Sequence, residues 1–255
     1  MFYNPRPAAT TAVRAWLDAG VTLKEAGGSL GGIMLHIEEP CRVDDDEAEV
    51  LKHVDGFLRR YGEHPIATVS NTIFPAALDR GDGIEALSAR YLSVYERRIC
   101  RQGEWGRYFH RMVAWKAEKK HVNQLAEIIR MLQGSCSDGG RFYSNTYEIG
   151  IFDPVRDLRK RANRQCLSLI ELKPERCKRL HMMAVYRNHF YIRRTLGNLI
   201  GLARLLEFIA RQAELSVGSL TVQSTHAELD SGSWCKSDTE RLIDECSRLL
   251  LMKAA

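Results

Sequence analysis

The sequence lacks the features that mark secreted, membrane-spanning or strongly basic proteins. Its first sixteen residues contain no apolar core of a secretory signal, and no apolar run approaches the ~20 residues that cross a bilayer. The net charge is only +5, a weak excess for a nucleic-acid-binding protein. Linkers, repeats and low-complexity stretches are also missing. These absences predict a single domain, residues 1–255, that is cytoplasmic and has neither a membrane nor a nucleic acid as partner.

Paired-cysteine motifs are missing as well. Seven cysteines lie far apart, at positions 41, 100, 136, 166, 177, 235 and 246, and no Cys-x-x-Cys occurs. An odd number at wide spacing is atypical of a disulfide framework or a zinc site. We therefore expect reduced thiols and no metal, in a chain long enough to bury a core without such staples.

Hydrophobic periodicity indicates the fold class. Helical spacing of apolar residues predicts helices at 46–61, 84–100, 121–132 (ending at Gly134) and in the C-terminal segment, capped by Ser237 or Asp238. Residues 196–213 are apolar nearly all round, which is typical of a helix buried in mid-domain. Short β-rich runs predict strands of one sheet at 28–38, 147–152, 166–172, 180–186 and 219–223. The fold class is α+β, with a central mixed sheet packed with helices, including one long buried helix.

The order of several short stretches in the second half of the sequence is informative. GRYFHRMVAW (106–115) precedes VNQLAEIIRML (122–132), a run ending in FDP (152–154) precedes Cys166, and YRNHFYIRRTLGN (186–198) precedes STHAE (224–228). In order and spacing they resemble the thymidylate synthase family over roughly residues 100–250. Arg187 follows Cys166 by 21 positions and Asn198 follows Arg187 by 11, both within a residue of the family pattern. The resemblance implies a thymidylate synthase-like fold and a homodimer paired sheet to sheet.

The resemblance also implies a chemistry. The thiolate of Cys166 would add to C6 of a pyrimidine and activate C5 for one-carbon transfer, either methylation or hydroxymethylation. Arg187 would lower the pKa of the thiol and bind an anionic group of the substrate, and Tyr108 would relay the C5 proton. Cys177, in a basic turn, is a weaker rival nucleophile. The alternative for Cys166 is a small buried hydrophobe.

Further residues would bind the substrate, a pyrimidine nucleotide or nucleoside. Beside Arg187, the resemblance implies Asn188 at an oxyanion, Asn198 at the ring, His226 at a sugar hydroxyl, and Glu228. An amide both donates and accepts, so Asn198 matches O4 and N3–H of uracil better than cytosine. Each of these residues also has a structural alternative, such as a helix N-cap for Asn198.

Departures from the family pattern leave the reaction open. Leu167 stands where the family has a histidine, Phe190 replaces the aspartate that engages folate, and Glu228 replaces a tyrosine. Asn145 and Thr146 stand where the partner subunit's arginines are expected. Methylene-tetrahydrofolate is the cofactor that the resemblance implies, but Phe190 and the missing C-terminal tail argue against it. The other functions to weigh are a folate-free enzyme acting on a non-phosphorylated specialised metabolite, and a non-catalytic protein that binds a ligand or partner.

Overall fold

The computed structural model describes residues 2–99, 106–117, 120–137, 139–160, 164–176 and 178–251. The helices are α1 Ala12–Glu25, α2 Asp45–Arg60, α3 Ile66–Ser70, α4 Ile84–Val94, α5 Tyr108–Val113, α6 Gln124–Cys136, α7 Pro154–Asp157, α8 Leu196–Gln212 and α9 Lys236–Leu251. A 3-10 turn spans Ala76–Leu78, and π-helical turns span Tyr95–Ile99 and Tyr191–Thr195. The strands are β1 Asn4–Pro5, β2 Ser29–Ile37, β3 Trp115–Lys116, β4 His121–Val122, β5 Glu148–Gly150, β6 Leu167–Glu175, β7 Arg179–Tyr186, β8 His189–Phe190 and β9 Ser216–Glu228.

One mixed sheet organises the described part of the chain. Its strand order is β1-β2-β9-β7-β6-β5, and β8 also pairs with β9. The β7–β9, β8–β9 and β1–β2 pairs are parallel, whereas β2–β9, β6–β7 and β5–β6 are antiparallel. Strands β3 and β4 form a separate small hairpin. The expected α+β class with a central mixed sheet is confirmed.

The two faces of this sheet differ in burial. Side chains on the core face are buried under helices: Ile33, Leu35, Ile37, Leu180, Met182, Ala184, Leu220 and Val222. The opposite face carries half-buried or exposed side chains: Met34, His36, Leu169, Glu171, Met183, Val185, Thr221 and Gln223. The register aligns Met34, Gln223, Val185 and Leu169 in one row across four strands. In one copy of the chain, this second face is therefore open to solvent.

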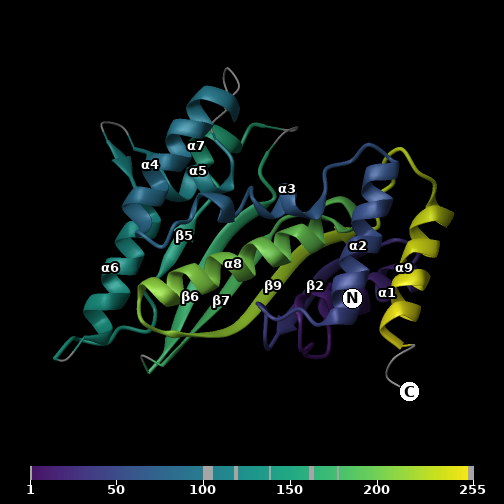
Figure 1. Cartoon of the computed structure of the whole chain (residues 1–255), viewed down its shortest axis with the longest axis horizontal. Coiled ribbons are helices and arrows are strands. Elements are labelled where there is room, and N and C mark those ends of the chain that lie inside the picture. The colour runs from purple at the N-terminus through teal and green to yellow at the C-terminus, as the bar shows by residue number, and fades with distance from the viewer. Residues whose placement is uncertain are drawn as a thin grey trace.

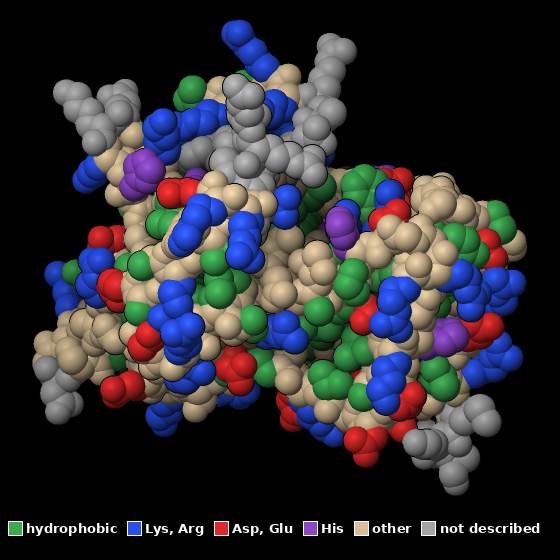
Figure 2. Space-filling model, turned by 45° about the horizontal axis from the view of Figure 1, so that its top comes forward, with side chains coloured by type: hydrophobic (Ala, Val, Ile, Leu, Met, Phe, Trp, Pro, Cys, Tyr) green, Lys and Arg blue, Asp and Glu red, His purple; other side chains and the backbone are tan. Residues whose placement is uncertain are grey.

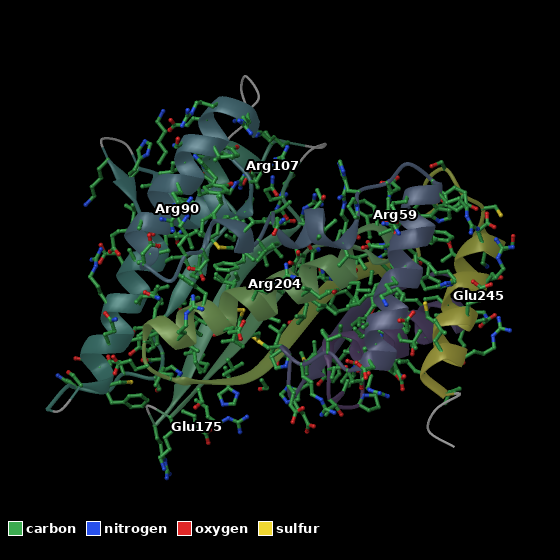
Figure 3. The ribbon with its side chains drawn as sticks, in the orientation of Figure 1. Arg59, Arg90, Arg107, Glu175, Arg204 and Glu245 are labelled. Atoms are coloured by element: carbon green, nitrogen blue, oxygen red, sulfur yellow. The ribbon has the colours of Figure 1, made fainter. Side chains whose placement is uncertain are left out.

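The expected buried helix is α8, which crosses the strands of the sheet (Figure 1). Two glycines let α3 approach it closely. A Cβ atom on Gly197 would lie 2.6 Å from the Val69 Cβ, and one on Gly201 would lie 2.8 Å from the Ser70 carbonyl oxygen. Arg204, labelled in the middle of α8 in Figure 3, donates to Ser70 Oγ at 3.0 Å. Helix α8 is therefore fixed between the sheet and α3.

The other helices form two groups at the ends of the sheet. Helices α1, α2 and α9 gather at the end that carries β2, where α2 and α9 run side by side, and α4 to α7 gather at the end that carries β5 (Figure 1). Thr11 caps α1, and the buried Trp16 donates its indole N–H to the Tyr191 carbonyl oxygen at 3.1 Å. One hydrophobic cluster runs through both groups, from α1 to α9.

Several boundaries differ from the sequence predictions. Gly134 does not end α6, which continues to Cys136, and Ser237 and Asp238 lie inside α9 rather than before it. Asp238 Oδ2 instead accepts from the Cys235 N–H at 3.2 Å, so the helix begins earlier than expected. The run 219–223 and the stretch 224–228 form one strand, β9.

The cysteines also differ from expectation. Cys136 at the end of α6 is disulfide-bonded, whereas Cys41, Cys166, Cys235 and Cys246 are free. The prediction of seven reduced thiols is therefore wrong. Because disulfides are rare in cytosolic proteins, the cysteines no longer support the expected cytoplasmic location. Among the described residues, no helix is both long and apolar enough to span a membrane, and no group of His, Cys, Asp and Glu is arranged to hold a metal ion.

Candidate active site

Cys166 lies immediately before β6, at the point where three elements meet. Its carbonyl oxygen accepts from the backbone N–H of Arg187, just past the end of β7, at 2.9 Å. Its own N–H and that of Leu167 donate to the Tyr108 hydroxyl oxygen, at 3.2 and 3.3 Å. The structure thus brings the three residues predicted to be catalytic together, with Tyr108 at the first turn of α5 just after Arg107 (Figure 3).

The Tyr108 side chain positions the start of β6. Burial raises the pKa of its hydroxyl to about 12, so the group stays protonated near neutral pH. Because the hydroxyl oxygen accepts two backbone N–H groups, its own proton is free to point elsewhere. This hydroxyl is therefore a proton donor at neutral pH, and not a base.

A group of arginines surrounds the thiol. The Arg187 guanidinium donates through Nε to the Gln165 carbonyl oxygen at 3.1 Å, and through Nη2 to the Arg164 carbonyl oxygen at 2.9 Å. The Arg164 guanidinium carbon stacks over the Phe152 ring, 4.5 Å from its centroid. The Arg164 Nε atom is buried and has no hydrogen-bond partner among the described residues. These contacts hold two positive charges at the backbone that leads into Cys166.

Several other arginines in the described part of the chain have an acidic partner. Arg193, for example, is paired with Asp230 at 2.5 Å. In contrast, Arg164, Arg187 and Arg194 are half-buried, and none of them has an acidic partner among the described residues. Half-buried charges without counterions are unfavourable unless a ligand or solvent compensates them. The cluster therefore suits an anionic group.

The protonation state of Cys166 reflects two opposing effects. Burial raises the pKa of the thiol, whereas the charges of Arg187, Arg164 and Arg194 lower it. Burial is the larger effect, so the pKa lies above its ordinary value in the ligand-free site. The sequence-based expectation of a lowered thiol pKa is right about the direction in which Arg187 acts, and wrong about the net result.

A network of buried side chains around His189 lies close to the candidate site. The imidazole of His189 stacks on the Tyr186 ring with centroids 3.8 Å apart, and Tyr186 is close enough to Cys166 and Tyr108 for their charges to raise its hydroxyl pKa further. His189 Nδ1 lies 2.7 Å from Ser224 Oγ, and its Nε2 lies 3.3 Å from Asn198 Nδ2. Asn198, in the first turn of α8, is thereby joined to the catalytic group through two aromatic rings.

The remaining predicted residues lie near the end of β9. Asn188 Nδ2 donates to Glu228 Oε1 at 3.3 Å, while the buried Asn188 Oδ1 atom has no partner in the part of the chain that the structure describes. Thr225 Oγ1 donates to the Arg187 carbonyl oxygen at 2.8 Å, which ties β9 to the end of β7. His226 is exposed and makes no hydrogen bond to the other predicted site residues in the described part of the chain. The rival nucleophile, Cys177, lies outside the described residues.

A buried ion pair holds the helix that carries Tyr108 in place. Arg111, on the same helix as Tyr108, pairs with Asp157 of α7, and both side chains are almost fully buried. Arg111 also donates to the carbonyl oxygens of Gly106, at 3.0 Å, and Ile151, at 2.8 Å. Gln124 joins this group by donating to the Arg111 carbonyl oxygen at 2.9 Å. Together these bonds fix α5 against α6, α7 and β5.

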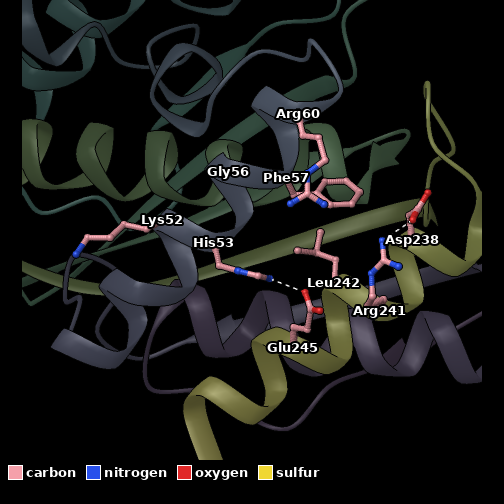
Figure 4. Close-up of a pocket in the computed structure, with 9 residues that line it drawn as sticks. All are labelled: Lys52, His53, Gly56, Phe57, Arg60, Asp238, Arg241, Leu242 and Glu245. Carbon is pink, nitrogen blue, oxygen red and sulfur yellow. Dashed lines mark hydrogen bonds and ion pairs between the residues drawn. The ribbon is translucent and has the colours of Figure 1, made fainter.

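A groove lies between α2 and α9 (Figure 4). Its lining residues are Lys52, His53, Gly56, Phe57, Arg60, Asp238, Arg241, Leu242 and Glu245. Four of its polar side chains are already paired within it, His53 with Glu245 at 2.8 Å and Arg241 with Asp238 at 2.6 Å. None of the sequence-predicted site residues lines this groove, and Cys166 remains the centre of the candidate site.

The viewed surface carries charges of both signs, and the sequence comparisons identify no family. Figure 2 shows Lys and Arg side chains interspersed with Asp and Glu over the viewed face, without one continuous basic area. No protein-family model matches the sequence, and a search of curated proteins finds no match.

Proposed function

We propose that the protein is a thymidylate synthase-like enzyme in which the Cys166 thiolate adds to C6 of a pyrimidine-type ring. The bond between Sγ and C6 forms as the C5–C6 electron pair moves toward C5 and the C4 carbonyl oxygen. C5 then attacks an electrophilic one-carbon unit, whose carrier departs as the leaving group. A methylene-level unit would take up water in hydroxymethylation, whereas methylation would also need a hydride, which a reduced folate would supply. Loss of the C5 proton and departure of Sγ restore the ring and the thiolate.

One observation carries this proposal. A free, half-buried thiol lies immediately before β6, beside three guanidinium groups that have no acidic partner among the described residues. Guanidinium charges stabilise a thiolate, and they also bind a phosphate or carboxylate. A structural cysteine in a core has no need of such surroundings.

The raised pKa of the thiol sets a condition on the mechanism. Because the ligand-free site favours the neutral thiol, Cys166 must lose its proton in the step in which Sγ attacks C6. Tyr108 accepts no proton near neutral pH, since its hydroxyl is already protonated with a pKa of about 12. Its role in this proposal is to donate its free O–H and to hold the backbone of Cys166 and Leu167 in place.

The cofactor and the assembly belong to the same proposal. Methylene-tetrahydrofolate follows from the family resemblance, and Phe190 in place of the folate-binding aspartate counts against it. A homodimer would cover the open sheet face, where Met34, Val185 and Leu169 form an apolar row with Gln223. A cytoplasmic location is likewise part of the proposal.

Two other functions have an observation in their favour. An enzyme for a non-phosphorylated specialised metabolite is favoured by Glu228, whose carboxylate accepts from Asn188 where the family binds a sugar. The arginine cluster would then bind a carboxylate. A non-catalytic, ligand-binding protein is favoured by the raised pKa of Cys166.

A thermal-shift screen tests the proposal. The panel holds uracil and cytosine nucleosides, their ribo and deoxy monophosphates, and reduced folates. A ligand at about 100 times its Kd adds about 2.7 kcal/mol to the free energy of unfolding, which gives a readable shift. We expect stabilisation by a uracil monophosphate, and a smaller shift in an Arg187→Gln variant.

The outcomes separate the proposed function from the metabolite enzyme. Stabilisation by monophosphates but not nucleosides supports an anion at the arginine cluster. Stabilisation by nucleosides, with no preference for phosphate, favours the metabolite enzyme. If no pyrimidine shifts the melting temperature of the folded protein, the proposed function is wrong.

A further inference from the structure

The parallel pair of strands β7 and β9 contains one irregularity. Leu180 lies opposite Val217 and Met182 lies opposite Leu220, so β9 advances three positions while β7 advances two. A bulge of this kind interrupts the regular hydrogen bonds of the ladder. The same pair joins the β1-β2-β9 part of the sheet to the β7-β6-β5 part. The bulge therefore lies where the two parts of the sheet are held together.

The side chain of His181 contacts the bulged segment of β9. The backbone N–H of Ser219 donates to His181 Nδ1 at 3.0 Å, and Ser219 Oγ lies 2.8 Å from the same nitrogen. The ring also packs against Gly218, where a Cβ atom would lie 2.8 Å from Nδ1. The imidazole thus supplies the acceptor for a backbone N–H at the point where the register shifts.

Two contacts fix the proton of the neutral imidazole. A backbone N–H can only donate, so Nδ1 accepts from Ser219 and carries no proton. An ionised carboxylate can only accept, and Oε2 of Glu175, labelled in Figure 3, lies 3.4 Å from Nε2. The proton of the neutral ring therefore resides on Nε2. Neither of these partners can reverse its role, whichever way the Ser219 hydroxyl turns.

Protonation of the ring must change these contacts. Both nitrogens of a charged imidazole are donors, so Nδ1 can no longer accept from the Ser219 N–H. The Ser219 hydroxyl oxygen, already 2.8 Å from Nδ1, is the acceptor that the new N–H meets. At Nε2 the contact with Glu175 becomes a full ion pair. The bulge therefore has two bonding patterns, one for each charge state of His181.

Few charged groups face the ring from the neighbouring strands. On β6 its cross-strand neighbour is Lys173, which pairs with Glu171 at 3.1 Å. On β7 the nearest charged residue is Arg179, two positions earlier, and β9 carries no titratable side chain before His226. In the part of the chain that the structure describes, Glu175 is the acidic group within ion-pair distance of the ring. A change at the bulge between about pH 5 and 8 is therefore assigned to His181 itself.

We propose that His181 is an acid-sensitive contact between β7 and β9. The neutral ring holds the Ser219 backbone N–H, and the protonated ring releases it and bonds the Ser219 hydroxyl and Glu175 instead. The change is confined to the bulge, and the strands stay paired on both sides of it. His181 alternates with Met183 and Val185 on the open face of the sheet, so the switch does not involve Cys166 and does not depend on the proposed function.

Amide hydrogen exchange measured by NMR tests this inference on the native protein. The protection factor of the Ser219 amide, which corrects for the intrinsic pH dependence of exchange, is measured between about pH 5 and 8, and ring protonation is followed from the imidazole proton shifts. We expect protection to fall by up to about tenfold as the ring is protonated, the order that loss of one hydrogen bond allows. The amide of Val222, beyond the bulge, should keep its protection. Constant protection of Ser219 while His181 titrates would overturn the proposal.

The matched control is His181→Asn, whose amide oxygen can accept near the position of Nδ1 but does not titrate. Its Ser219 protection should not depend on pH, and a fall equal to that of native protein would refute the role of the imidazole. Ser219→Ala removes the second acceptor, so its amide should lose more protection in acid; an equal loss would exclude the hydroxyl. The ¹⁵N shifts of native His181 need no variant. We expect the neutral ring to carry its proton on Nε2, and the opposite tautomer would overturn the proposal.

Discussion

The charge of Arg187 should control how readily Cys166 reacts. The thiol pKa lies above its ordinary value because burial outweighs the arginines, so the neutral thiol predominates at pH 7. Arg187 has the strongest of the three lowering effects. Its replacement by glutamine removes one adjacent positive charge, which we expect to raise the pKa by about one unit. The thiolate fraction at pH 7, and with it the alkylation rate, should fall about tenfold.

The assay is the pH dependence of alkylation by iodoacetamide, followed by mass spectrometry of the peptide that contains Cys166. Site-resolved detection separates it from Cys246, whose pKa burial raises to about 12, and from the exposed Cys41 and Cys235. The rate at Cys166 should rise with pH across the measured range, because the thiolate is the nucleophile.

The control is Arg179→Gln, which removes an exposed arginine from the opposite end of the same strand, β7. It should leave the alkylation rate of Cys166 unchanged. Three results would refute the reasoning: a wild-type midpoint below pH 7, no effect of Arg187→Gln, or an equal effect of Arg179→Gln. The first would mean that the arginines outweigh burial.

Three further predictions concern stability and are read from urea unfolding. Asp157→Asn leaves the buried guanidinium of Arg111 without its counterion and should cost about 3–5 kcal/mol. The pKa of His189 is about 3 in the folded protein and about 6.5 when unfolded, so its contribution is complete above pH 6.5. It is lost as pH falls from 6.5 toward 3, by up to about 1.4 kcal/mol per pH unit, and His189→Phe should lack this slope. Gly197→Ala places a methyl group against α3 and should cost about 1–3 kcal/mol, whereas Gly134→Ala, with open space around its Cβ position, should be neutral or mildly stabilising.

Each of these stability predictions has its own contradicting result. A loss below 1 kcal/mol in Asp157→Asn would mean that water reaches Arg111. The same acid slope in native protein and His189→Phe would mean that other groups account for it. Equal effects of the two glycine substitutions would mean that the α3–α8 contact tolerates a methyl group.

Strong periodicity made the central elements predictable from the sequence. Helix α8 is apolar nearly all round, and β6 and β7 are short apolar runs between polar turns. Helix α1 was not predicted, although its signals are present: Thr11 at the N-cap and the apolar residues Val13, Trp16, Leu17 and Leu23 at helical spacing. The family resemblance covers only roughly residues 100–250, so it gave no indication of a helix in the N-terminal part of the chain.

End positions were less predictable, because single residues do not decide them. Gly134 lies inside α6 without any positive φ, so a glycine there interrupts nothing. The Asp238 side chain accepts from the backbone N–H of Cys235, three positions earlier. Helix α9 therefore begins before Asp238, although Asp238 is the residue in the sequence that indicates a cap. The β9 strand continues through its polar last residues because β2 pairs with it as far as Glu228.

The candidate site was predictable only in part. The order of Cys166, Arg187 and Tyr108 in the sequence predicted their grouping, and the structure places them in contact. Arg164 and His189 were not singled out. A lone arginine in a basic loop and a lone histidine between Asn188 and Phe190 carry no periodic signal, although Arg164 is only two residues from Cys166 in the sequence.

The most direct test of the central claim is hydrogen exchange at C5 of a uracil nucleotide. Addition of Cys166 to C6 makes C5 basic, so its hydrogen should exchange with solvent even without a one-carbon donor. The protein and the nucleotide are incubated in D₂O, and the C5–H signal is followed by NMR. We predict loss of the signal with native protein and none with Cys166→Ser. No exchange by a folded, nucleotide-bound protein, or equal exchange by Cys166→Ser, would contradict covalent addition by Cys166.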